Sequence, residues 1–153
     1  MAKTVITVIT VIADMPLAKF LLGFLIVILA ADYVGIWNGF YGPDSRYDVP
    51  LHIAGGAWIA LLAVYLFEKR PGAAPGDIFA GWKRMLFIAG FVALVGIAWE
   101  FYEYFVDVAI LKKYALGGQQ PAQAFDTLTD LLNDLIGAFL AIISLHFTQK
   151  RGL

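Results

Sequence analysis

Four long apolar segments, separated by short stretches rich in glycine and proline, divide this chain of 153 residues. They cover about residues 17–37, 49–67, 85–105 and 125–147. Each comes close to the roughly 20 residues with which an α-helix crosses about 30 Å of hydrocarbon. The chain is 61% hydrophobic, whereas soluble domains are roughly 45–50% apolar. The sequence therefore predicts an all-α integral membrane bundle of four transmembrane helices in a single domain, 1–153.

The rest of the composition narrows the classes of function. The formal net charge of −1 gives no indication of nucleic-acid binding. Because the chain contains no cysteine, disulfides and thiolate chemistry are excluded, and a metal site must use oxygen ligands and imidazole. We expect the apolar stretch 5–12 to form a short interfacial helix. The first long segment is interpreted as a retained span rather than a signal peptide.

Lysine and arginine are distributed unequally between the two ends of the predicted bundle. Eight lie on the side that holds the N-terminus, and three lie on the other side. Cytoplasmic loops carry the excess of basic residues in multi-pass proteins. We therefore expect a protein of the cytoplasmic (inner) membrane with both termini cytoplasmic and the lipid bilayer as its main partner.

Seven carboxylates and one histidine fall within or beside the spans, all at the outward-facing end. The second span begins at this end, the third ends there and the fourth begins there. Ionisable residues at membrane depth are costly, so each is a candidate for function. The three groups are Asp48 with His52, then Glu100, Glu103 and Asp107, then Asp126, Asp130 and Asp134.

Helical phase places each group on one face, because residues three and four apart are neighbours on a helix. A small residue, which allows close helix approach in lipid, continues each face. The three stripes are Asp48, His52 and Gly55; Gly96, Glu100, Glu103 and Asp107; and Asp126, Asp130, Asn133 and Gly137, with Asp134 on the flank. We expect these stripes to turn toward one polar pocket.

Such a pocket carries an excess of negative charge, because clustered carboxylates repel one another and few basic residues lie nearby. A divalent metal cation would satisfy both charge and geometry. A histidine with several carboxylates suits zinc, manganese or iron, whereas an all-oxygen site suits magnesium or calcium. The expected metal ligands are His52, Glu103, Asp130 and Asp48, and the expected catalytic residues are Glu100, Asp126 and Asn133.

The runs that hold these residues resemble those of a known family. Residues 48–56 read Asp-x-x-x-His-x-x-x-Gly, and residues 99–103 read Trp-Glu-x-x-Glu. Asp126, Asp130, Asn133 and Gly137 then follow in that order. This order is similar to that of the YjdF-type inner-membrane proteins and, more distantly, of the VanZ-like group. The resemblance covers 47–137 and implies a shared polar site without specifying a reaction. Its residues would be His52, Glu100, Glu103, Asp126, Asp130 and Asn133.

Three functions are consistent with the pocket, and the sequence leaves open whether the protein is an enzyme. The leading hypothesis is a metal-dependent hydrolase acting on a lipid or lipid-linked headgroup, in which the metal activates water or polarises a phosphoryl or acyl oxygen. Glu100 or Asp126 would serve as second ligand or general base, and Asn133 would donate a hydrogen bond. The alternatives are a proton- or ion-coupled transporter and a structural or accessory subunit without catalysis.

Overall fold

The computed structural model describes residues 16–41, 45–69, 81–110 and 121–150, and it confirms the all-α prediction. Four of its helices are long and apolar enough to cross a membrane. The interfacial helix predicted at 5–12 lies outside the described residues. The elements are α2 (Pro16–Asn38), α3 (Asp48–Val64) continued by the π-helical turn η1 (Tyr65–Lys69), α4 (Trp82–Phe105) continued by η3 (Val106–Ile110), and α5 (Pro121–Lys150).

The ends of α2 follow ordinary helix chemistry. Pro16 stands in the first turn, where the missing N–H would have no helical partner. Gly39 follows the last helical residue with a φ of 66°, a left-handed conformation that glycine adopts without a steric penalty. The N–H of Phe40 then donates to the carbonyl of Gly35 at 2.9 Å, which closes the helix.

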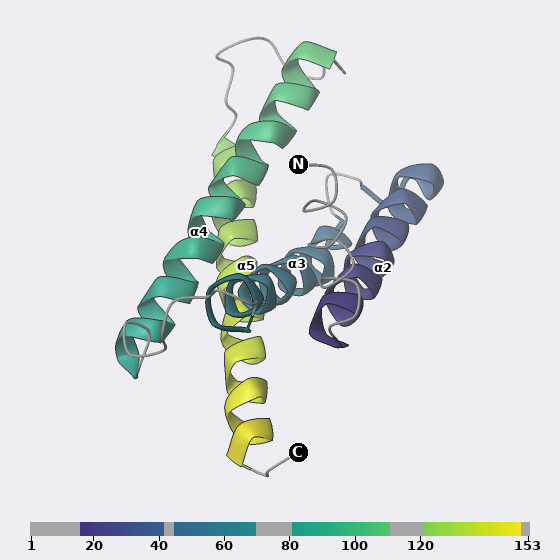
Figure 1. Cartoon of the computed structure of the whole chain (residues 1–153). Helices are drawn as coiled ribbons and strands as arrows, with labels where there is room; N and C mark the ends of the chain where they lie inside the picture. Colours follow the sequence, from purple (N-terminus) through teal and green to yellow (C-terminus); the bar gives the residue numbers. More distant parts are fainter. Residues whose placement is uncertain (1–15, 42–44, 70–80, 111–120, 151–153) are drawn as a thin grey trace, which may run out of the picture.

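α3 is the central helix. It packs most extensively against α5, and it also contacts α4 and α2. In Figure 1, α3 lies between α2 on one side and the pair α4 and α5 on the other. Gly56 of α3 lies against the backbone of Asp134 on α5, and Gly137 of α5 lies against the backbone carbonyl of Ile53 on α3. Because neither glycine has a side chain, the backbones of the two helices come into direct contact.

An apolar core fills the space between α3, α4 and α5. It is made of small and branched side chains, and large apolar side chains on the outer faces remain exposed, as expected where helices meet lipid. The core residues are Ile59, Ala60, Ala63 and Val64 on α3, Ile88 and Val92 on α4, and Ala138, Ala141 and Ile142 on α5.

The contact between α2 and the rest of the bundle includes one hydrogen bond. The indole N–H of Trp58 on α3 donates to the carbonyl of Leu21 on α2 at 2.8 Å. Only 11% of the most apolar stretch of α2 is buried. We therefore expect Trp58→Phe to lower the free energy of unfolding by about 1 kcal/mol, measured by denaturation in mild detergent. Trp82→Phe is the control, because Trp82 is 69% exposed, and an equal loss in both variants would contradict this prediction.

Candidate cation site at one end of the bundle

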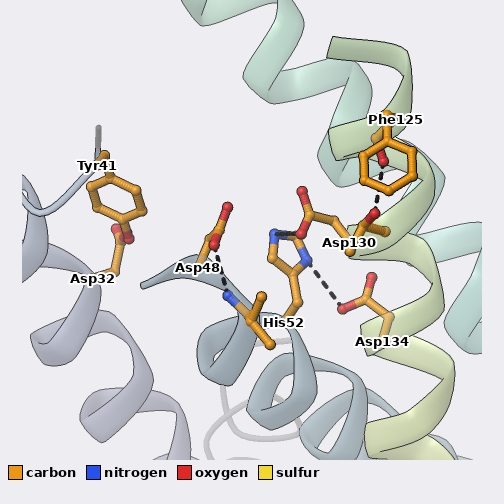
Figure 2. A network of polar contacts seen from close by, with 9 residues as sticks. Asp32, Tyr41, Asp48, His52, Phe125, Asp130 and Asp134 are labelled. Atoms are coloured by element: carbon orange, nitrogen blue, oxygen red, sulfur yellow. Dashed lines mark hydrogen bonds and ion pairs between the residues drawn. The ribbon is translucent and has the colours of Figure 1, made fainter. Parts of the chain in front are cut away.

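The polar cluster is centred on His52, in the second turn of α3. Figure 2 shows the imidazole between two carboxylates of α5. The ring Nδ1 lies 3.3 Å from Oδ1 of Asp134, and Nε2 lies 3.7 Å from Oδ1 of Asp130. The His52 side chain is 10% exposed, and both carboxylates are 7% exposed. Because Asp130 and Asp134 are four residues apart, they stand side by side on α5 and hold the ring between them.

Two glycines surround Asp134. Gly56 on α3 lies against its backbone, and Gly96 on α4 leaves room for its carboxylate. A Cβ at position 96 would lie 2.6 Å from Oδ2 of Asp134, which is closer than Cβ atoms approach other heavy atoms in real proteins. Three helices therefore meet at Asp134. They can approach so closely because Gly56 and Gly96 have no side chains.

Two sets of ligand-type atoms converge in the cluster. His52, Glu100 and Asp130 each offer one atom, and these atoms lie within 4.8 Å of one another. Asp48, Asp126 and Asp130 form a second set within the same limit. Metal–ligand bonds of roughly 2.0–2.6 Å separate neighbouring ligand atoms by roughly 3–4 Å. Small side-chain movements would therefore bring either set to coordination distance, and Asp130 belongs to both.

Two buried polar atoms of this cluster have no hydrogen-bond partner among the residues that the structure describes. They are Oε1 of Glu100 and the amide nitrogen Nδ2 of Asn133, and Asn133 as a whole is 7% exposed. A buried polar atom without a partner is costly, and a cation would satisfy the carboxylate oxygen directly. The donor set of oxygen and imidazole is one that divalent cations accept. The residues present therefore fit a divalent metal.

Compensating positive charge is scarce at this site. Within the described part of the chain, neither Asp130 nor Asp134 contacts a lysine or arginine, and their ion-pair partner is His52. The bidentate pair between Arg84 and Glu68, at 2.6 and 3.0 Å, joins α4 to η1 at the other end of the bundle. The carboxylates of the cluster thus outnumber the single histidine, which is the arrangement that a bound cation would stabilise.

The structure brings most of the predicted site residues together, with differences on α4. Glu100 supplies an atom to the first ligand set, whereas Glu103, predicted as a ligand, is exposed. Gly96 and Glu100 are four apart and face α5, while Glu103 lies nearly one turn farther toward the helix end. Glu103 still lies within electrostatic range of His52. The side chain of Asp107 lies outside the described residues.

Asp134 is the residue whose importance the sequence pattern underestimates. Helical phase predicts it on the flank of the α5 stripe, outside the ligand and catalytic sets. In the structure its carboxylate lies closer to the His52 ring than that of Asp130 does. Asp130 and Asp134 are four residues apart, as are Asp48 and His52. This spacing is the sequence signal that both aspartates could contact one partner, here His52.

A second polar contact at this end lies apart from the cluster, beside α2. The Tyr41 hydroxyl donates to Asp32, and the Tyr47 hydroxyl donates to the carbonyl of Ala31 at 2.7 Å. Figure 2 shows Asp32 and Tyr41 to one side of Asp48 and His52. Partial burial and the neighbouring Asp32 carboxylate raise the pKa of the Tyr41 hydroxyl, so it remains a proton donor. Asp32 is therefore engaged by Tyr41 and belongs to neither ligand set.

Fold and site together define a multi-pass membrane protein with a histidine–carboxylate cluster at one end of its helices. The chain belongs to the family described as predicted membrane protein (DUF2238), which matches residues 2–151. No curated protein and no solved structure matches the chain. Membership of this family agrees with the resemblance to YjdF-type proteins, whereas the likeness to the VanZ-like group stays a prediction.

Proposed function

We propose that this protein binds a divalent cation and uses it to hydrolyse a lipid or lipid-linked headgroup. The observation that carries the proposal is the convergence of ligand atoms from His52, Glu100 and Asp130 within 4.8 Å, with Oε1 of Glu100 buried and unpartnered. Three protein ligands leave further coordination positions for water and substrate, as in catalytic metal sites. A bound cation would polarise a phosphoryl or acyl oxygen and lower the pKa of a bound water.

The surrounding residues suit the remaining roles. Asp126 is exposed, and its carboxylate lies within 4.8 Å of that of Asp130, which supports a role as proton acceptor at the mouth of the site. Asp48 shares this second ligand set and would hold the proton or a second coordination position. The unpartnered amide of Asn133 would donate a hydrogen bond to an oxygen of the substrate.

The surroundings of the cluster support a lipid-linked substrate. The cluster lies near the ends of three membrane helices, where headgroups meet hydrocarbon. Phe101 and Phe125, next in sequence to Glu100 and Asp126, are 71% and 73% exposed. Acyl or polyprenyl chains would contact these aromatic rings while the polar headgroup meets the carboxylates. The excess of basic residues on the other side supports an outward-facing site on the cytoplasmic membrane.

The apolar core argues against a path across the membrane. Beyond His52, α3 continues with Ile59, Ala60, Ala63 and Val64, which pack against apolar residues of α4 and α5. Proton and ion relays need polar groups in succession. A polar cluster closed on one side by apolar packing supports binding and hydrolysis over coupled transport.

The test is headgroup release by the purified protein in lipid nanodiscs. The probes are phosphatidylglycerol, phosphatidylethanolamine and a polyprenyl diphosphate. We expect release that EDTA abolishes and that one divalent cation restores. Glu100→Gln replaces a charged carboxylate ligand by a neutral amide, so the rate of headgroup release should fall by more than the roughly 10–100-fold lost when an outer-sphere partner is removed.

Asp32→Asn is the matched control, because Asp32 is a carboxylate at the same end of the bundle but outside both ligand sets. It should retain the parent's rate. Release that neither EDTA nor Glu100→Gln alters would overturn hydrolysis by a bound cation. Ion flux into liposomes that depends on Glu100 would favour the transporter instead.

A further inference from the structure

We infer that Asp134 is a positioning residue, which orients the imidazole of His52 so that Nε2 faces the cation. The inference rests on the proposed function and deepens it, because Asp134 belongs to neither set of converging ligand atoms. Histidine ligands commonly donate their second ring N–H to a carboxylate, which fixes the tautomer and the ring orientation.

The two ring nitrogens of His52 have different surroundings. Nδ1 lies 3.3 Å from Asp134 Oδ1, within hydrogen-bonding distance, whereas Nε2 lies 3.7 Å from Asp130 Oδ1 and makes no hydrogen bond to it. A proton on Nδ1 would be donated to Asp134. The lone pair of Nε2 would then face Asp130, which together with Glu100 completes the first ligand set.

Asp134 is also confined by glycines of two neighbouring helices. The residue is 5% exposed, and its backbone lies against Gly56. Its second oxygen, Oδ2, lies against Gly96 on α4, so the carboxylate has little freedom to turn away from His52. Such confinement is expected of a group that orients a ligand, because a loosely held partner would not select one tautomer.

The first test is the tautomer of His52 in the zinc-loaded protein. Nitrogen-15 NMR of histidine-labelled protein in nanodiscs, carrying His146→Gln to leave a single histidine, reports which ring nitrogen bears the proton. With zinc bound we expect the proton on Nδ1 and the metal on Nε2 in the parent, and a partial exchange of these two positions in Asp134→Ala. Zinc bound at Nδ1 of the parent, with the proton on Nε2, would overturn the inference.

The second test is zinc affinity, measured by competition with a chromophoric chelator. Asp134→Ala should weaken binding by roughly 10–100-fold. Asp134→Asn keeps the shape and a neutral acceptor, so its affinity should lie between those of the parent and the alanine variant. Gly96→Ala should also weaken binding, because the added methyl group displaces Oδ2 of Asp134.

The control and the outcomes separate the two proposals. The control is Gly90→Ala, on α4 like Gly96. The added Cβ would meet no atom within 4 Å, so this variant should bind zinc as the parent does. Zinc binding that is unaffected by Asp134→Ala and Gly96→Ala would overturn the role of Asp134 and leave the cation site intact. Absence of zinc binding by the parent would overturn the proposed function and, with it, this inference.

Discussion

Replacing Gly56 by alanine is expected to separate α3 from α5 and to destabilise the fold, whereas the same change at Gly55 is not. A Cβ at this position would overlap the backbone carbonyl and Cα of Asp134. Because the clash is with backbone, no side-chain rotation can relieve it, and one helix must move. Overpacking of this kind lowers the free energy of unfolding by about 1–3 kcal/mol, occasionally more. The measurement is denaturant unfolding of the purified protein in mild detergent, followed by tryptophan fluorescence.

Gly55→Ala provides the control, one residue away on the same helix. A Cβ at position 55 meets nothing within 4 Å, and alanine is a better helix former than glycine by about 1 kcal/mol. This variant should therefore be as stable as the parent or slightly more stable. Equal destabilisation by the two substitutions would contradict the helix rotation that directs Asp134 toward His52. Gly137→Ala should behave like Gly56→Ala, because its Cβ would overlap the carbonyl of Ile53.

Asp130→Asn should abolish tight cation binding while the metal-free protein still folds. Asp130 is the carboxylate shared by both ligand sets, so Asp130→Asn replaces a charged ligand by a weak neutral one in each set. We expect zinc affinity to fall by more than the roughly 10–100-fold typical of an outer-sphere partner. The asparagine keeps the shape of the side chain and removes one of several mutually repelling charges, so the metal-free fold should be retained.

The readout for Asp130→Asn is a zinc titration beside an unfolding curve recorded without metal. Asp32→Asn again serves as the comparison, since it removes one carboxylate without touching either ligand set. Unchanged zinc affinity in Asp130→Asn would show that the two ligand sets do not form the site. Unfolding of Asp130→Asn without metal would instead indicate that this carboxylate is structural.

Much of this architecture follows from the sequence, because hydrophobic length and glycine–proline breaks locate the helices. The ends of the first three predicted spans lie within a few residues of the ends of α2, of α3 with η1, and of α4. The fourth predicted span matches the membrane-spanning part of α5, Ala124–Leu145. Chain topology alone then brings the start of α3, the end of α4 and the start of α5 to one end. The convergence of His52, Glu100 and Asp130 could therefore be expected from the sequence alone.

What the sequence does not provide is the rotation of each helix about its own axis. Helical phase defines a stripe on each helix, but the residue of the stripe that meets another helix depends on how closely the backbones approach. Here the contacts at Gly56 and Gly137 turn Asp134 toward His52 and bring it close to the ring. Glu103, by contrast, lies toward the end of α4 and remains exposed. The two residues therefore differ from prediction because of helix packing, which residue spacing does not encode.

The most direct test of the cation site is the metal content of the protein purified in detergent, determined by elemental mass spectrometry. The comparison is a His52→Ala/Glu100→Gln double variant with an unchanged circular dichroism spectrum. We predict a near-stoichiometric divalent cation in the parent and its loss in the variant. No metal in either protein, even after incubation with zinc, manganese, iron, magnesium and calcium, would contradict the proposal and leave the cluster with a structural or proton-handling role.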